Sequence, residues 1–142
     1  MSVEENKAIA RRLFESVWNE GNMDVIDEII NAPEFVDNHY MFPEPLHGTD
    51  NFKQIVTAFR SAFPDVRLTI EDVLGEGDKV VLRWSLRGTH QGDLMGIPPT
   101  GKAVQLTGMV IVRFSGGKIV ERWVSEDALG LMRQLGAIPA SG

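Results

Sequence analysis

The sequence predicts an α+β fold in which helices pack in the concave face of a curved, mainly antiparallel sheet. Apolar residues recur at helical spacing through about residue 63, and they alternate with period two from about residue 66 to residue 124. A helical pattern then returns over residues 128–136. Because helices come first and the strands follow as a meander, the order favours helices on one side of a single sheet. Such an arrangement leaves a cone whose open end suits a small-molecule pocket.

Composition bounds the classes of function. The 142 residues suit one domain, expected to span residues 1–139 with a loose tail at 140–142. The net charge of −6, with no cluster of Lys and Arg, argues against a nucleic-acid partner. Cysteine is absent, which excludes disulfides and thiol catalysis. With neither a membrane-length apolar run nor a secretion signal in view, the expectation is a cytoplasmic protein with no membrane contact.

Three amphipathic patterns predict helices in the first half of the chain. The first begins with Ser2-Val3-Glu4-Glu5, which is a capping box, and ends near Gly21. Asn22 is the predicted cap of a shorter second helix, and Thr49 is the predicted cap of a third. Between the second and third helices, the stretch from Phe35 to His39 is expected to be extended.

The strands follow after residue 64. Residues 66–71 and 80–87 alternate apolar with polar side chains on either side of the turn signal Gly75-Glu76-Gly77-Asp78. Residues 104–114 are apolar on both faces, which is typical of a central strand. Ser115-Gly116-Gly117 marks the last hairpin turn.

Asp127 lies where the last strand meets the terminal helix. Asp is among the preferred N-cap residues, so capping is one interpretation of this residue. The other is catalytic: a carboxylate at the end of the sheet could look into a dry pocket, where burial would raise its pKa toward that of a general acid or base. The two roles are compatible.

Three residues near Asp127 are candidates for the pocket wall. Trp123 and Glu121 share strand parity with Asp127 if no bulge intervenes, so Trp123 would wall the pocket, unless it belongs to the core or to a dimer interface. Glu121 would need a partner inside, and Arg113 on the neighbouring strand is the expected one. For Glu121 a structural ion pair is favoured over a second acid/base role.

Trp84 and His90 share inward parity on an earlier strand. His90, at the end of that strand, is expected at the pocket rim, the alternative being a histidine bonded to the backbone of the following loop. That loop, Gly92–Lys102, contains two prolines and three glycines. It could be a lid, but Pro98-Pro99 favours a stiff crossover.

Several motifs follow one another along the chain: Phe63-Pro64-Asp65, residues 76–81, Gly88-Thr89-His90-Gln91-Gly92, residues 96–102, Gly117-Lys118-Ile119-Val120-Glu121, and residues 127–136. Together they resemble the SnoaL-like polyketide cyclase (ester cyclase) family of the nuclear transport factor 2-like superfamily. The resemblance runs from the first helix to about Pro139. It implies a cone-shaped α+β barrel that is dimeric or higher and that closes rings by intramolecular aldol condensation, without metal or cofactor.

The resemblance also suggests roles for particular residues. It places the family's acid/base aspartate at Asp127 and its pocket histidine at His39, where a neutral imidazole could orient the carboxylate or polarise a carbonyl. The family pattern is closest to Asp directly before His, whereas this chain has Asn38 between Asp37 and His39. We place Asn38 among the pocket residues. The three histidines lack the spacing of metal ligands, so no metal is expected.

The sequence therefore predicts a cofactor-independent enzyme that transfers protons on a mostly apolar, carbonyl-bearing small molecule, with Asp127 as acid/base. Epoxide hydrolysis, dehydration or isomerisation on the same fold is an alternative chemistry. The other class is a non-catalytic ligand-binding or dimerisation module in which Asp127 only caps the helix. Whether a free Asp127 oxygen faces an enclosed pocket distinguishes the two classes.

Overall fold

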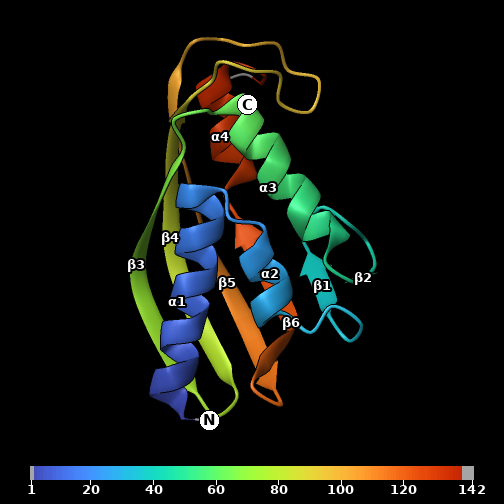
Figure 1. Ribbon diagram of the computed structural model, residues 1–142. Coiled ribbons are helices and arrows are strands. Elements are labelled where there is room, and N and C mark those ends of the chain that lie inside the picture. The colour runs from blue at the N-terminus through green and yellow to red at the C-terminus, as the bar shows by residue number, and fades with distance from the viewer. Residues whose placement is uncertain (1, 139–142) are drawn as a thin grey trace.

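The computed structural model describes residues 2–138, which form four helices and six strands (Figure 1). The helices are α1 (Val3–Glu20), α2 (Asp24–Ile29), α3 (Asp50–Ala62) and α4 (Ala128–Leu135). The strands are β1 (Val36–His39), β2 (Leu46–His47), β3 (Arg67–Glu76), β4 (Lys79–Thr89), β5 (Ala103–Ser115) and β6 (Lys118–Glu126). Within residues 2–138, no helix combines the length and apolar character needed to cross a membrane. The predicted tail, residues 140–142, lies outside the described residues.

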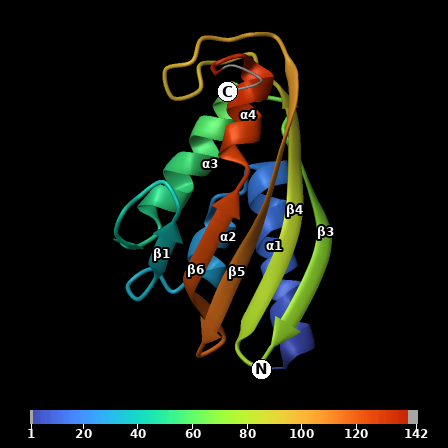
Figure 2. The same cartoon turned by 180° about the vertical axis from the view of Figure 1, so that it is seen from behind.

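One sheet carries the fold, with strand order β2-β1-β6-β5-β4-β3. Every neighbouring pair is antiparallel except β1 and β6, which run parallel. Helices α1 and α2 lie against one face, as Figure 1 shows, and the view from behind in Figure 2 shows the other face uncovered by these helices. Helix α4 and the loop between β4 and β5 close one end. The predicted α+β architecture is confirmed.

The helix boundaries follow local chemistry. The Ser2 hydroxyl accepts a hydrogen bond from the Glu5 N–H at 3.1 Å, and the Glu5 carboxylate accepts one from the Ser2 N–H at 3.2 Å, so the predicted capping box forms. Gly21 ends α1 with φ 69°, a left-handed conformation that glycine adopts without a steric penalty. Two predicted caps differ: α2 is preceded by Met23 rather than Asn22, and Thr49 precedes α3 without a side-chain cap bond.

The core lies between α1, α3 and the inner face of the sheet. Ala10, Leu13 and Val17 are fully buried, at the spacing that gives α1 one apolar stripe. From the sheet, Val80 and Leu82 are buried with them. Burial of this apolar face stabilises α1 far more than helix propensity does.

A β-bulge in β6 sets which side chains face the core. Phe114 pairs with Ile119, whereas Arg113 pairs with Glu121, so Val120 is an extra residue in β6. Ile119 and Val120 are both buried, and the alternation restarts one residue later. The inward positions after the bulge are Arg122, Val124 and Glu126. The bulge lies before Glu121 and none follows it in β6, so Glu121, Trp123 and Asp127 share one parity as predicted, but this parity is outward.

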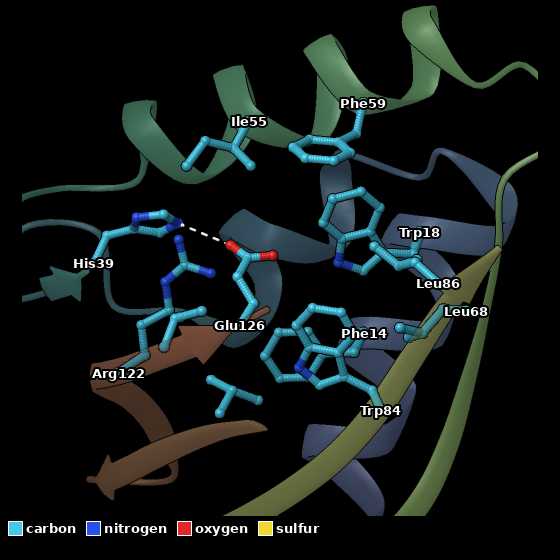
Figure 3. Close-up of a pocket in the computed structure, with 12 residues that line it drawn as sticks. Phe14, Trp18, His39, Ile55, Phe59, Leu68, Trp84, Leu86, Arg122 and Glu126 are labelled. Carbon is cyan, nitrogen blue, oxygen red and sulfur yellow. Dashed lines mark ion pairs between the residues drawn. The ribbon is translucent and has the colours of Figure 1, made fainter. Parts of the chain in front are cut away.

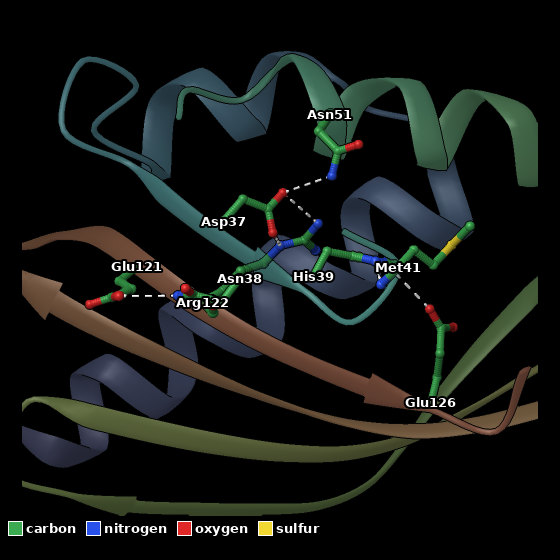
Figure 4. Close-up of polar contacts among 8 residues, drawn as sticks. All are labelled: Asp37, Asn38, His39, Met41, Asn51, Glu121, Arg122 and Glu126. Carbon is green, nitrogen blue, oxygen red and sulfur yellow. Dashed lines mark hydrogen bonds and ion pairs between the residues drawn. The ribbon is translucent and has the colours of Figure 1, made fainter. Parts of the chain in front are cut away.

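A buried ion pair ties β1 to β6. Arg122 Nε donates to Asp37 Oδ1 at 2.7 Å, and a terminal amino group of Arg122 donates to Asp37 Oδ2 at 2.9 Å (Figure 4). Asn51 on α3 donates to Asp37 Oδ2 at 3.1 Å, and the guanidinium carbon lies 4.2 Å from the centre of the Phe52 ring. Two charges removed from water are thus matched by a bidentate pair and a further donor.

We predict that Asp37→Ala lowers the free energy of unfolding by about 3–5 kcal/mol, because it leaves the Arg122 guanidinium buried without its partner. Urea denaturation measures this. The matched control is Arg113→Ala, which breaks the more exposed Arg113–Glu121 pair and should cost about 1 kcal/mol or less. Equal losses in the two variants would contradict this account of the buried pair.

Candidate active site

A hollow lies between the helices and the inner face of the sheet (Figure 3). A water-sized molecule can occupy about 40 Å³ of it, and the space counted out to its open side is about 480 Å³. Its apolar wall comes from α1, α3 and the strands: Phe14, Trp18, Ile55, Phe59, Leu68, Trp84, Leu86, Val110 and Val124. Its polar side chains are His39, Arg122 and Glu126. The hollow is therefore a mostly apolar container with one carboxylate in it, which is the composition expected of a small-molecule site.

Glu126 is the carboxylate inside this hollow. It is the last residue of β6, on the inward parity set by the bulge, and its side chain is 10% exposed. Glu126 Oε1 lies 3.5 Å from His39 Nε2, across the pair β1 and β6. The arrangement places an acid/base group and an imidazole side by side in a largely dry environment.

Hydrogen bonding fixes the tautomer and the orientation of His39. Its Nδ1 accepts the Met41 backbone N–H at 3.2 Å, so in the neutral ring the proton lies on Nε2, the nitrogen that faces Glu126. The ring stacks on Tyr40 with centroids 4.7 Å apart and meets Phe42 edge-on at 5.9 Å. His39 is therefore a donor toward the carboxylate.

Tyr40 is a second donor to Glu126. Burial raises the pKa of the Tyr40 hydroxyl, and the Glu126 charge and the hydrogen bond to that carboxylate raise this pKa further. The phenol therefore stays protonated. Glu126 accordingly has donors from two consecutive residues, His39 at the end of β1 and Tyr40 directly after it.

Gly108 makes room for this carboxylate. It is opposite both Glu126 on β6 and Trp84 on β4. A methyl group at this position would lie 2.5 Å from Trp84 Cζ2 and 2.9 Å from Glu126 Cβ. Only glycine lets these two side chains share the inner face here.

A second hollow adjoins the first, and a water-sized molecule can occupy about 110 Å³ of it. The two share His39, Ile55, Phe59 and Glu126. The rest of its wall is almost wholly apolar and comes from the segment after β1, the loop after β4, strand β5 and helix α4: Tyr40, Met41, Leu94, Met95, Leu106, Ala128, Leu131 and Met132. The Glu126–His39 pair therefore stands where two apolar compartments meet.

Asp127 lies outside both compartments, contrary to the prediction that it faces the pocket. Its side chain is exposed and accepts the Gly130 N–H at 2.9 Å as the N-cap of α4. Its surroundings are an open depression on the outer face of the sheet. Glu126 takes the inward position at the end of β6, so the next residue, Asp127, lies on the outer face. The capping interpretation describes this residue, and the enclosed carboxylate is its neighbour.

Other predicted pocket residues also lie outside both hollows. Trp123 lies under Lys79, whose Nζ is 6.0 Å from the ring centre. Glu121 accepts from Arg113 at 3.1 and 3.2 Å, the expected structural ion pair. Asn38 donates to Glu121 Oε2 at 3.0 Å. Of the predicted wall residues, Trp84 does line the hollow.

His90 anchors the loop that follows β4 and lines neither compartment. It is fully buried against Phe63, and its Nδ1 accepts the Thr100 N–H at 3.2 Å. The Lys102 carbonyl accepts the His90 N–H at 2.9 Å. His90 is therefore bonded to the following loop, which was the alternative interpretation, and it does not lie at the pocket rim.

Sequence reasoning missed Glu126, Arg122 and Tyr40. The signal for the first two is weak: each is a charged residue on a strand whose inward side depends on one extra residue. For Tyr40, an aromatic residue directly after the pocket histidine is the only clue. In the described part of the chain, no three His, Asp or Glu side chains are grouped as a metal site would need.

Comparison with known proteins identifies the family. The model of the SnoaL-like polyketide cyclase family matches residues 8–135. The chain belongs to this family. The aklanonic acid methyl ester cyclase DnrD of Streptomyces peucetius is 31% identical over 90% of this chain and 88% of its own length, and the nogalonic acid methyl ester cyclase of Streptomyces nogalater is 32% identical over 85% and 90%.

Solved structures of this family have the same fold. A proposed polyketide cyclase from Acidithiobacillus ferrooxidans superposes with a TM-score of 0.80 at 32% identity, covering 96% of this chain and 99% of its own. AclR of Streptomyces galilaeus, described as a proposed hydroxylase, reaches a TM-score of 0.86 at 29% identity, covering 97% and 85%. The predicted family is confirmed, and the curated relatives are named as cyclases.

We predict that Gly108→Ala lowers the free energy of unfolding by about 1–3 kcal/mol, because its methyl group must displace Trp84 or Glu126. Chemical denaturation measures the loss, and the displaced Trp84 should alter the tryptophan emission spectrum. Ser125→Ala, an exposed change on the neighbouring strand, is the control and should alter neither. Wild-type stability and emission in Gly108→Ala would mean that Trp84 and Glu126 are not held this closely.

Proposed function

We propose that this protein is a cyclase that closes a ring by intramolecular aldol condensation, with Glu126 as the acid/base. The observation that carries the proposal is a 10%-exposed carboxylate in a mostly apolar hollow, 3.5 Å from an imidazole that is fixed as a donor. The cyclase names of the curated relatives support the reaction class.

The chemistry requires a single group to move one proton twice. Glu126 removes a proton from the carbon beside a carbonyl, and the resulting enolate carbon attacks a second carbonyl carbon of the same molecule. The new alkoxide then takes the proton from the Glu126 carboxyl group, so the base is regenerated and no atom is lost. A buried carboxylate suits both steps because little solvent has to reorganise around it.

His39 and Tyr40 act on Glu126. The Nε2–H of His39 points at the carboxylate, and the Tyr40 hydroxyl donates to it, so they hold its oxygens in place. His39 does not serve as the base here, because Nδ1 is occupied by the Met41 N–H and Nε2 carries the proton. Both are positioning residues in this proposal.

The walls suggest the substrate class. Flat aromatic side chains from α1, α3 and β4 favour a planar, apolar, carbonyl-bearing ligand, and the adjoining compartment gives length for a second ring or chain. A free carboxylic acid would bring a second negative charge beside Glu126, whereas a methyl ester would not. The substrates in the relatives' names are methyl esters, which supports this preference.

Two further expectations stay proposals. We infer that two copies pair through the outer face of the sheet, which carries Trp123 and the 53%-exposed Met109. Sedimentation analysis measures the oligomeric state. A cytoplasmic location remains a prediction from the sequence.

We predict that Glu126→Gln lowers kcat by about 10²–10⁴-fold with aklanonic or nogalonic acid methyl ester, because an amide cannot accept the proton. Product formation is followed by chromatography. Asp127→Asn is the matched control one residue away, and since Asn also caps helices it should retain activity and stability.

Two outcomes count against the proposal. Loss of activity in Asp127→Asn with full activity in Glu126→Gln would return the role to Asp127. Tight binding of the esters by the wild-type protein without any turnover would indicate a ligand-binding module instead.

A further inference from the structure

Arg122 is only partly used by the ion pair that holds it. A guanidinium has five N–H donors, and Asp37 accepts two of them, one from Nε and one from a terminal amino group. The other terminal amino nitrogen, Nη1, has no hydrogen-bond partner among residues 2–138. These unused donors lie on a side chain that lines the hollow containing Glu126.

The unused amino group is not sealed in protein. Within the described residues, the fully enclosed side-chain atoms without a partner are Asn6 Oδ1 and His90 Nε2, and Arg122 is not among them. The Arg122 side chain is only 8% exposed, and the space that it borders is the hollow. Figure 3 shows its guanidinium grouped with His39 and Glu126 at one end, across from the aromatic side chains.

Ring closure creates a charge that this group could meet. When Glu126 takes the proton, the negative charge moves to an enolate oxygen and then to an alkoxide, inside an apolar container where an unpaired anion is costly. Donors fixed beforehand at that position would stabilise the charge without reorganising. Asp37, Asn51 and the Phe52 ring fix the guanidinium in this way.

We propose that Arg122 is a catalytic residue that donates through its unused amino group to the oxyanion formed during ring closure. The inference rests on the proposed function. Arg122, Val124 and Glu126 are successive inward-facing residues of β6, and all three line the hollow. A substrate lying along β6 would place its reacting C–H at Glu126 and its carbonyl oxygen at Arg122.

The test must separate a lost donor from a lost fold. Removing Arg122 alone strands Asp37, so the main variant is Asp37→Leu/Arg122→Met, in which apolar side chains of similar size replace the whole pair and the protein is expected to fold. Asn51 is half-buried, so water can replace the bond that it loses. Arg122→Lys is the second variant, because it keeps a charge for Asp37 but has no planar fork to serve two partners. Circular dichroism and denaturation show that each is folded.

We expect kcat on the two methyl esters to fall by about 10²–10³-fold in the double variant, with a smaller fall in Arg122→Lys. Binding supplies a readout that does not need turnover. The ionised phenol alizarin should bind the wild-type protein at least about tenfold more tightly than neutral anthraquinone, and the double variant should lose this preference. Glu126→Gln should keep it.

The outcomes distinguish the two proposals. Folded variants that keep wild-type kcat and the same preference for alizarin would overturn the role of Arg122. If no variant or wild-type protein turns over the esters, but the alizarin preference still depends on Arg122, the proposed cyclisation fails while the anion site stands. A loss of kcat with an unchanged alizarin preference would make Arg122 structural rather than catalytic.

Discussion

The extra residue in β6 governs the chemistry of the pocket. Because Val120 has no partner on β5, the strand turns its alternate side chains over, and Arg122 and Glu126 enter the space beneath the helices. The ion pair of Arg122 with Asp37 then locks β1 onto β6, and His39 follows two residues after Asp37 on the same edge. The two halves of the site are thus assembled by one irregularity in the sheet and one bond across it.

Features set by residues close together in the sequence could be predicted, whereas features set by contacts between distant segments could not. The capping box at Ser2, the apolar stripes of the helices and the turn after β5 are local patterns, and the structure has each of them. The parity of β6 is not local: a bulge changes it by one residue, and nothing in the letters of a Val- and Ile-rich strand marks where the extra residue lies. The predicted carboxylate, Asp127, lies one position after the residue that lines the hollow, Glu126.

His39 shows that a residue's place can be predicted while its role cannot. Its place in the pocket follows from the family pattern, but its role depends on which ring nitrogen is free. That is set by a backbone N–H two residues later, which no sequence pattern specifies. Likewise, strand parity predicted His90 at the pocket rim, but its ring accepts a hydrogen bond from the Thr100 N–H and anchors the loop instead. Family membership fixes the container, and these single contacts decide what the container can do.

The junction between β6 and α4 leaves no tolerance for a change in chain length. Glu126 is paired in the sheet, and the next residue already donates its N–H to the Thr107 carbonyl at 2.9 Å and caps α4 with its side chain. One residue inserted here would turn the Glu126 carboxylate toward the uncovered face of the sheet. One residue deleted would remove the N-cap of α4 from its position. Surface loops in general tolerate insertions, but this connection should keep its length even where its side chains diverge.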